Sequence, residues 1–287
     1  MSSEWGDREV LQRGQSSSRK TTLRSNGGID MSWTKIGDRG KELCARFGKV
    51  LVISSDNNRI WQYDGSPGRW THIGDRARQV AISQKGIFCI STDNDTIWQY
   101  NGSPHRWTQV GERANALVAD ESNLYCISSD NNQIWQYQWS PNRWVHIGDR
   151  ARQLAASGGM LFCASTDNDT IWQYNGSPHR WTKIGDRASA ITSGSKELYC
   201  ISSDQNQIWR YEGAPNRWTH VGERAKDLVR GGDLLCVIST DNNTIWRYNG
   251  SPHNWSHVGD RGRQIATTGK DLYVVSTDND TVWHRRV

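Results

Sequence analysis

Tryptophan recurs every 37 residues along this chain, in two interleaved series that hold fourteen of its 16 tryptophans. One series comprises Trp33, Trp70, Trp107, Trp144, Trp181, Trp218 and Trp255; the other comprises Trp61, Trp98, Trp135, Trp172, Trp209, Trp246 and Trp283. A constant period of this length indicates a chain built from copies of one small structural unit. Seven copies therefore run from Trp33 to Val287, and the last is cut short after Trp283.

Each copy contains four segments of strand length, separated by turn residues. In the second copy these segments are Arg78–Ser83, Gly86–Ser91, Thr96–Tyr100 and Arg106–Val110. The connectors are too short for a helix, and no segment keeps a 3.6-residue period. The pattern predicts an all-β, seven-bladed β-propeller of four-stranded antiparallel blades.

The incomplete last copy predicts how the ring closes. The first copy begins with Trp33–Ile36, whereas the last copy ends after its third strand, so that residues 263–285 lack a fourth strand. We expect this N-terminal strand to pair with the last blade, because closure removes free sheet edges.

A second period of 74 residues shows that the copies come in two versions. Ser-Ser-Asp stands at 54–56, 128–130 and 202–204, and Ser-Thr-Asp stands at 91–93, 165–167 and 239–241. A site that recurs in every blade should therefore occur in two slightly different forms.

Two polar connectors should emerge at the same end of the propeller. One is Gly-Asp/Glu-Arg, which joins successive blades, and the other is Ser-x-Asp-Asn, which joins the second and third strands. The Gly-Ser-Pro connector and the variable loop between the first two strands should lie at the opposite end. In the second copy the first end gathers Asp75, Arg76, Asp93, Asn94 and Trp98.

These residue types suit a shallow sugar site between blades. Carboxylate, amide and guanidinium groups bond to hydroxyls, while the face of a Trp packs on the C–H surface of a sugar. The predicted glycan-binding residues are Arg39, Asp56, Asn57, Trp61, Asp75, Arg76, Asp93, Asn94, Trp98, Arg113, Asp130, Asn131, Trp135, Arg150, Asp167, Asn168, Trp172, Arg187, Asp204, Trp209, Arg224, Asp241, Asn242, Trp246, Arg261, Asp278, Asn279 and Trp283.

Structural roles compete with this interpretation. Arg76 could form a bidentate pair with an Asp that staples adjacent blades. Asp93-Asn94 could be a simple turn, because Asn tolerates left-handed dihedral angles. The third-strand Trp residues could pack in the core.

Cysteine and histidine positions follow the repeat. Cys89, Cys126, Cys163 and Cys200 are equivalent in successive blades, too far apart for a disulfide, and Cys236 is one residue out of phase. We expect six free thiols. Because the histidines are dispersed around the ring, we expect no metal cage and no cofactor. No catalytic motif is present, and the polar features recur in every blade, which argues against an enzyme.

Charge and hydropathy exclude further classes. A net charge of +5 with interspersed signs does not indicate nucleic-acid binding. No apolar run of 18 residues occurs, and Met1–Val10 holds no secretory signal, so we expect no membrane span and a cytoplasmic location.

Residues 1–32 form a separate arm before the propeller at 33–287. Residues 12–28 have a linker-like composition; our hypothesis is that residues 1–30 dock on the propeller or on a neighbouring chain and could build a homo-oligomer.

The repeated W-T-x-I-G-D-R-A and S-x-D-N-x-I-W-Q-Y resemble tectonin repeats, found in lectins of fungi and slime moulds, over residues 33–287. This resemblance implies a non-enzymatic β-propeller lectin that acts in defence against foreign cells. It also implies cytoplasmic members that bind O-methylated glycans such as methylated fucose or mannose. The competing class is a protein–protein interaction scaffold, since the loops between the first two strands vary from blade to blade.

Overall fold

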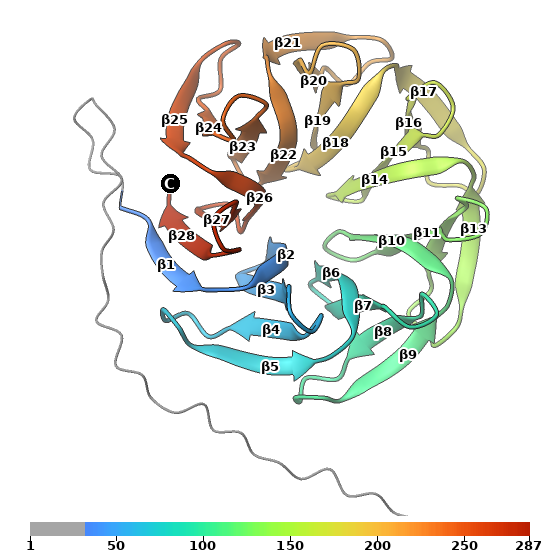
Figure 1. Ribbon diagram of the computed structural model, residues 1–287. Coiled ribbons are helices and arrows are strands. Elements are labelled where there is room, and N and C mark those ends of the chain that lie inside the picture. The colour runs from blue at the N-terminus through green and yellow to red at the C-terminus, as the bar shows by residue number, and fades with distance from the viewer. Residues whose placement is uncertain (1–31) are drawn as a thin grey trace, which may run out of the picture.

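The computed structural model describes residues 32–287, in which four-stranded antiparallel sheets surround a central axis (Figure 1). Each sheet is one blade, and its strands run from the axis to the rim in chain order, except in the last blade, where the first strand of the chain is outermost. The expected seven-bladed propeller is therefore confirmed for the described part of the chain.

The strand bounds follow the repeat closely. Blade 1 comprises β2 (Gly40–Arg46), β3 (Lys49–Ser54), β4 (Ile60–Tyr63) and β5 (Trp70–Gly74); blade 2 comprises β6 (Ala77–Ser83), β7 (Gly86–Ser91), β8 (Ile97–Tyr100) and β9 (Trp107–Gly111); blade 3 comprises β10 (Ala114–Ala119), β11 (Leu124–Ser128), β12 (Ile134–Tyr137) and β13 (Trp144–Gly148); blade 4 comprises β14 (Ala151–Ser157), β15 (Met160–Ser165), β16 (Ile171–Tyr174) and β17 (Trp181–Gly185). Blade 5 comprises β18 (Ala188–Gly194), β19 (Glu197–Ser202), β20 (Ile208–Tyr211) and β21 (Trp218–Gly222); blade 6 comprises β22 (Ala225–Gly231), β23 (Leu234–Ser239), β24 (Ile245–Tyr248) and β25 (Trp255–Gly259); blade 7 comprises β26 (Gly262–Thr267), β27 (Asp271–Ser276), β28 (Val282–Arg286) and β1 (Thr34–Gly37). The strands of blade 2 match the predicted segments to within one residue at each end.

The first strand of the chain completes the last blade. β1 pairs antiparallel with β28, with Thr34 opposite His284 and Lys35 opposite Trp283. Trp33 is buried beside them, and its indole Nε1 donates to the carbonyl oxygen of Val258 at 2.9 Å. The predicted closure of the ring is confirmed.

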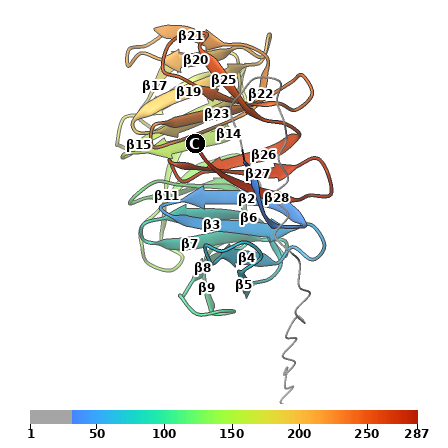
Figure 2. The same cartoon turned by 90° about the vertical axis from the view of Figure 1, so that its left-hand side faces the viewer.

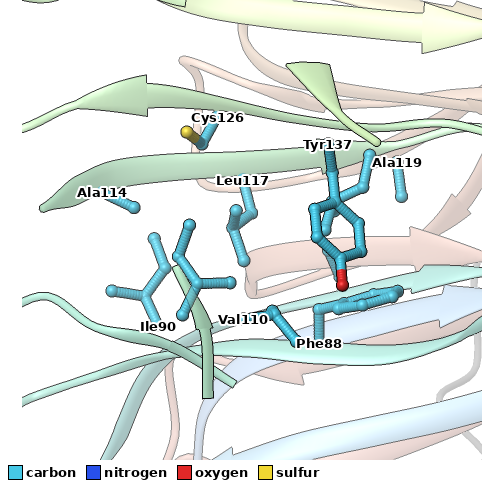
Figure 3. Close-up of a cluster of buried hydrophobic side chains, with 11 residues drawn as sticks. Phe88, Ile90, Val110, Ala114, Leu117, Ala119, Cys126 and Tyr137 are labelled. Carbon is cyan, nitrogen blue, oxygen red and sulfur yellow. The ribbon is translucent and has the colours of Figure 1, made fainter. Parts of the chain in front are cut away.

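The hydrophobic core lies between blades and not at the axis. Successive residues of β7 point to opposite faces of the sheet, so Ile87 and Cys89 pack toward blade 1 while Phe88 and Ile90 pack toward blade 3. Figure 3 shows the second of these clusters, where Phe88 and Ile90 face Leu117. Both faces of a strand are covered, which explains why the second strands are apolar at consecutive positions. Figure 2 shows the same ring of blades from the side.

A tryptophan on the outermost strand joins each blade to the preceding one. Trp107 of blade 2 donates from Nε1 to the carbonyl oxygen of Ile73 in blade 1, at 2.7 Å. Its indole lies over Gly74, where an added Cβ would stand 2.7 Å from that nitrogen. The same hydrogen bond recurs at Trp33, Trp70, Trp144, Trp181, Trp218 and Trp255. The Gly of each W-T-x-I-G segment is therefore required by the Trp of the next blade.

The two versions of the repeat differ in the turn between the second and third strands. In blades 1, 3 and 5 this turn has one residue at positive φ, namely Asn58, Asn132 and Asn206. In blades 2, 4, 6 and 7 it has two, namely Asn94 with Asp95, Asn168 with Asp169, Asn242 with Asn243, and Asn279 with Asp280. Strict alternation therefore breaks once, at blades 6 and 7.

The cysteines are free thiols in the described structure, as expected. Cys236 packs toward blade 7, whereas Cys89 packs toward the preceding blade, as its shifted phase predicts. No helix among residues 32–287 is long and apolar enough to cross a membrane. The hypothesis that residues 1–30 dock or build an oligomer falls on residues outside the described part.

Candidate ligand-binding site between the blades

The two polar connectors of a blade lie side by side, as predicted. Asp75 and Arg76 precede β6, and Thr92 follows β7, so the antiparallel pairing of these strands brings their ends together. The Thr92 amide donates to the carbonyl oxygen of Arg76 at 2.6 Å. The Arg76 guanidinium donates from Nη1 to Oδ2 of Asp93 at 2.8 Å.

This Arg–Asp ion pair recurs in every blade. The pairs are Arg39–Asp56, Arg76–Asp93, Arg113–Asp130, Arg150–Asp167, Arg187–Asp204, Arg224–Asp241 and Arg261–Asp278. Each pair joins two connectors of the same blade. The alternative in which Arg76 staples adjacent blades was therefore wrong, because its partner Asp93 lies in the turn after β7 of the same blade.

The seven arginines of these ion pairs contribute little to the stability of the fold. Their side chains are between 67 % and 75 % exposed, and exposed ion pairs contribute little to folding. All seven also have a positive φ, as in Arg76 at 55° and Arg150 at 59°. Such a backbone conformation is unfavourable for a non-glycine residue and tends to occur where a side chain serves a function.

A cavity opens beside each of several ion pairs. In blade 2 it is lined by Asp75, Arg76, Cys89, Ser91, Asp93, Asn94, Thr96, Trp98, Trp107 and Gln109, and its volume is ≈ 380 Å³. Equivalent cavities of ≈ 250, 270 and 290 Å³ lie on blades 3, 4 and 6. The cavity of blade 4 also includes Ile134 of blade 3. The site is therefore between blades, with two Trp rings, an apolar floor and a charged rim.

The indole of the third-strand Trp is held in place by its neighbours. Trp98 donates from Nε1 to the hydroxyl of Thr96 at 2.8 Å, and Trp172 and Trp246 make the same bond to Thr170 and Thr244. All seven third-strand Trp residues are half-buried. These rings are therefore partly packed in their blades, and those of Trp98, Trp135, Trp172 and Trp246 also line the described cavities.

Hydrogen bonds lower the pKa of two carboxyl groups of the site. The Ser54 hydroxyl and the Arg39 guanidinium lower the pKa of Asp56 below its usual value. The Ser128 hydroxyl likewise lowers the pKa of Asp130, with a smaller effect from Arg113.

The structure brings most predicted residues together, with two qualifications. Asn94 lines its cavity, but Asn131, Asn168 and Asn242 are not among the residues that line the described cavities of blades 3, 4 and 6. Blades 1, 5 and 7 keep the ion pair and the half-buried Trp61, Trp209 and Trp283. Sequence reasoning missed the fourth-strand Trp, for example Trp107, although its equal spacing was a visible signal.

Two expectations about the rim were wrong. The Gly-Ser-Pro connector was expected far from the Asp-Arg connector, yet the amide of His105 donates to the carbonyl oxygen of Ile73 at 2.9 Å. Strand twist turns the outermost strand along the circumference, so its end meets the next blade's connector (Figure 1). The histidines are consequently not all dispersed, because His72 of blade 1 and His105 of blade 2 have ring centroids 4.5 Å apart.

Between blades 1 and 2, at the Gly-Ser-Pro connectors, lies another cavity, of ≈ 520 Å³. Its lining includes Lys49, Gln62, Lys85 and Tyr100. Lys85 also reaches the ring of Trp139, whose centroid lies 4.0 Å from its ammonium nitrogen. This surface changes from blade to blade because its loops differ in sequence.

Comparison with known proteins identifies the family. The Tectonin domain model matches residues 39–213 and 91–286, which together span most of the chain. A search of curated proteins finds no match. Among solved structures, YCF48 from Cyanidioschyzon merolae has 10 % identity and a TM-score of 0.64, covering 88 % of this chain and 98 % of that one. BamB from Moraxella catarrhalis has 12 % identity and a TM-score of 0.53, covering 88 % and 83 % respectively. These likenesses show the fold alone, whereas the domain match shows that the chain belongs to the Tectonin domain family.

Proposed function

We propose that this protein is a multivalent lectin, without enzymatic activity, that takes one sugar residue in each inter-blade cavity. The observation that carries the proposal is the recurrence of one cavity, with the same Trp, Arg and Asp residues, on blades 2, 3, 4 and 6. Arg76 and Asp93 present charged groups to sugar hydroxyls, and Trp98 offers an aromatic wall.

Avidity compensates for the weakness of each site. A small sugar in a shallow site binds near the millimolar level, about −4 kcal/mol. Simultaneous engagement of several sites on a cell surface adds a factor of ~10² to 10⁴. A ring of similar cavities would thereby agglutinate foreign cells, in keeping with a role in innate defence.

The sugar we propose is an O-methylated fucose or mannose. The cavity floor at Cys89 is apolar, and burying one methyl group there gains ~0.8 kcal/mol. The resemblance to cytoplasmic tectonin lectins supports the same choice.

Calorimetry with a monovalent methylated sugar tests the proposal. We expect more than one sugar per chain and weaker binding of the unmethylated sugar. Arg76→Gly should remove one site without loss of stability, because glycine adopts the positive φ of that position freely. Arg106→Ala removes the same charge from an exposed position outside the described cavity lining and serves as the matched control. A stoichiometry of one, or equal binding by Arg76→Gly and wild type, would contradict the proposal.

The second candidate is a protein-interaction scaffold that uses the surface at the Gly-Ser-Pro connector of blade 2. It is favoured by the cavity at Lys85 and by the loops that vary around it. A glycan array with no bound sugar, together with a protein partner whose binding is lost in Lys85→Ala, would favour this candidate.

A further inference from the structure

Two clusters of metal-ligating side chains lie at the rim, and each shares one aspartate, Asp75 or Asp149, with the lining of a proposed sugar cavity. One consists of His72, Asp75 and His105, and the other consists of His146, Asp149 and His179. In each cluster the donor atoms of the three side chains all lie within 4.8 Å of one another. We propose that each cluster binds one divalent transition-metal ion, with Zn²⁺ as the representative ion.

Each histidine nitrogen of the first cluster already lies close to a carboxylate oxygen of Asp75, near the separation that two ligands of one metal ion require. His72 Nε2 is 3.0 Å from Asp75 Oδ1, and His105 Nδ1 is 3.4 Å from Asp75 Oδ2. Zinc–nitrogen and zinc–oxygen bonds of about 2.0–2.2 Å place tetrahedral ligands roughly 3.3 Å apart. In the second cluster the matching separations, at Asp149, are 3.0 and 3.8 Å.

The fold holds these side chains in place. The imidazole of His72 stacks on Trp61, with ring centroids 4.8 Å apart, and its Nε2 also contacts the carbonyl oxygen of Gly74 at 3.0 Å. His105 is anchored by the bond from its amide to Ile73. A metal can bind Nε2 only when this nitrogen carries no proton, and the metal would replace the contact of Nε2 with the Gly74 carbonyl oxygen.

The donor set selects the kind of metal. Two imidazoles and one carboxylate suit Zn²⁺, Co²⁺, Ni²⁺ and Cu²⁺, whereas Ca²⁺ and Mg²⁺ prefer oxygen ligands alone. Asp75 and His105 are about half exposed, so water can complete the coordination. Three protein ligands with an open position form a labile site and not a closed structural one.

Two other junctions between blades lack the complete set of three ligands and serve as internal controls for the metal sites. The junction between blades 2 and 3 places Gln109 and Asn142 where the histidines stand, so it lacks imidazoles. At His220 and His253 the rings again meet, with centroids 4.7 Å apart, but Glu223 replaces the aspartate. Among the described residues, no ion pair joins Glu223 to either ring, and we therefore assign no third site.

Titration of the tag-free, chelator-treated full chain with Co²⁺ tests the assignment. Residues 1–31 contain no His or Cys and add no competing ligand of these types. We expect visible d–d absorption that saturates at two ions per chain, displacement by Zn²⁺, and no effect of Ca²⁺. His105→Asn should leave one ion, and the double variant with His179→Asn should leave none.

The variants are designed to fold. Asn142 occupies the same connector position with a φ of 56°, close to the 59° of His105, so asparagine suits this backbone. His253→Asn should still bind two ions.

Because each ion would join adjacent blades, Zn²⁺ should also raise the melting temperature of wild type and not that of the double variant. Absence of bound Co²⁺ in wild type, or two ions in the folded double variant, would overturn the proposal.

Discussion

Gly74→Ala should destabilise the propeller through one contact with the next blade. The added Cβ would stand 2.7 Å from Nε1 of Trp107 and 3.0 Å from Cε2. Carbon contacts are optimal at about 3.5–4.0 Å, so the indole must retreat by roughly 0.8 Å. Its retreat is opposed by the 2.7 Å hydrogen bond from Nε1 to Ile73. Overpacking of ~1–3 kcal/mol and a lost bond of ~1 kcal/mol give an expected loss of about 2–4 kcal/mol.

A double-mutant cycle with Trp107→Phe isolates that contact. Phenylalanine lacks the pyrrole ring that the new methyl group would meet, and the carbonyl oxygen of Ile73 keeps its bond from the amide of His105. Gly74→Ala should therefore cost less than ~1 kcal/mol in the Trp107→Phe background, a coupling of about 2 kcal/mol. Urea unfolding followed by far-UV circular dichroism measures all four proteins. Equal costs of Gly74→Ala in the two backgrounds would refute the reasoning.

Three further predictions concern pH, thiols and closure. Burial raises the pKa of Glu42 to about 7, so the native state keeps a proton that the unfolded state releases, and stability should fall as pH rises from about 4.5 to 7. Glu42→Gln introduces the residue that stands at the equivalent position of blade 2, Gln79. It should remove this pH dependence and raise the free energy of unfolding by roughly 1–3 kcal/mol at pH 8, with no gain at pH 4. Equal effects at both pH values would contradict this prediction. Burial raises the pKa of Cys89 to about 12, and the other thiols behave alike, so a disulfide reagent should label native protein slowly and six thiols after denaturation; rapid native labelling of several thiols would be inconsistent with the core. Deleting residues 1–37 should open the edge of β28 and lower both the melting temperature and the solubility, and an unchanged melting curve would show that β1 is dispensable.

The sequence predicts the blades well because their determinants are local and repeated. The turn residues, the period of the tryptophans and the missing final strand each point to one structural solution, and the pairing of β1 with β28 follows from them. The site was predicted in part, since Arg76 and Asp93 flank paired strands whose ends must coincide.

The rim was not predictable in the same way. Contact between His105 and Asp75 depends on how far the sheet twists between its first and fourth strands, which the periodicity of residue types does not encode. The role of Trp107 also depends on the neighbouring blade, because its hydrogen-bond acceptor lies 34 residues earlier in the chain.

The two turn types cannot alternate all the way around the ring, because the number of blades is odd. A ring of two alternating kinds of member closes without a fault only when its members are even in number. With seven blades, two like neighbours must meet, and the second turn type occurs in both blade 6 and blade 7. The ring consequently has a seam and a direction, so its junctions are chemically distinguishable despite their common plan. A ligand that spans three neighbouring blades meets two adjacent turns of the second type only where it covers both blade 6 and blade 7, so its seven rotational settings are not equivalent.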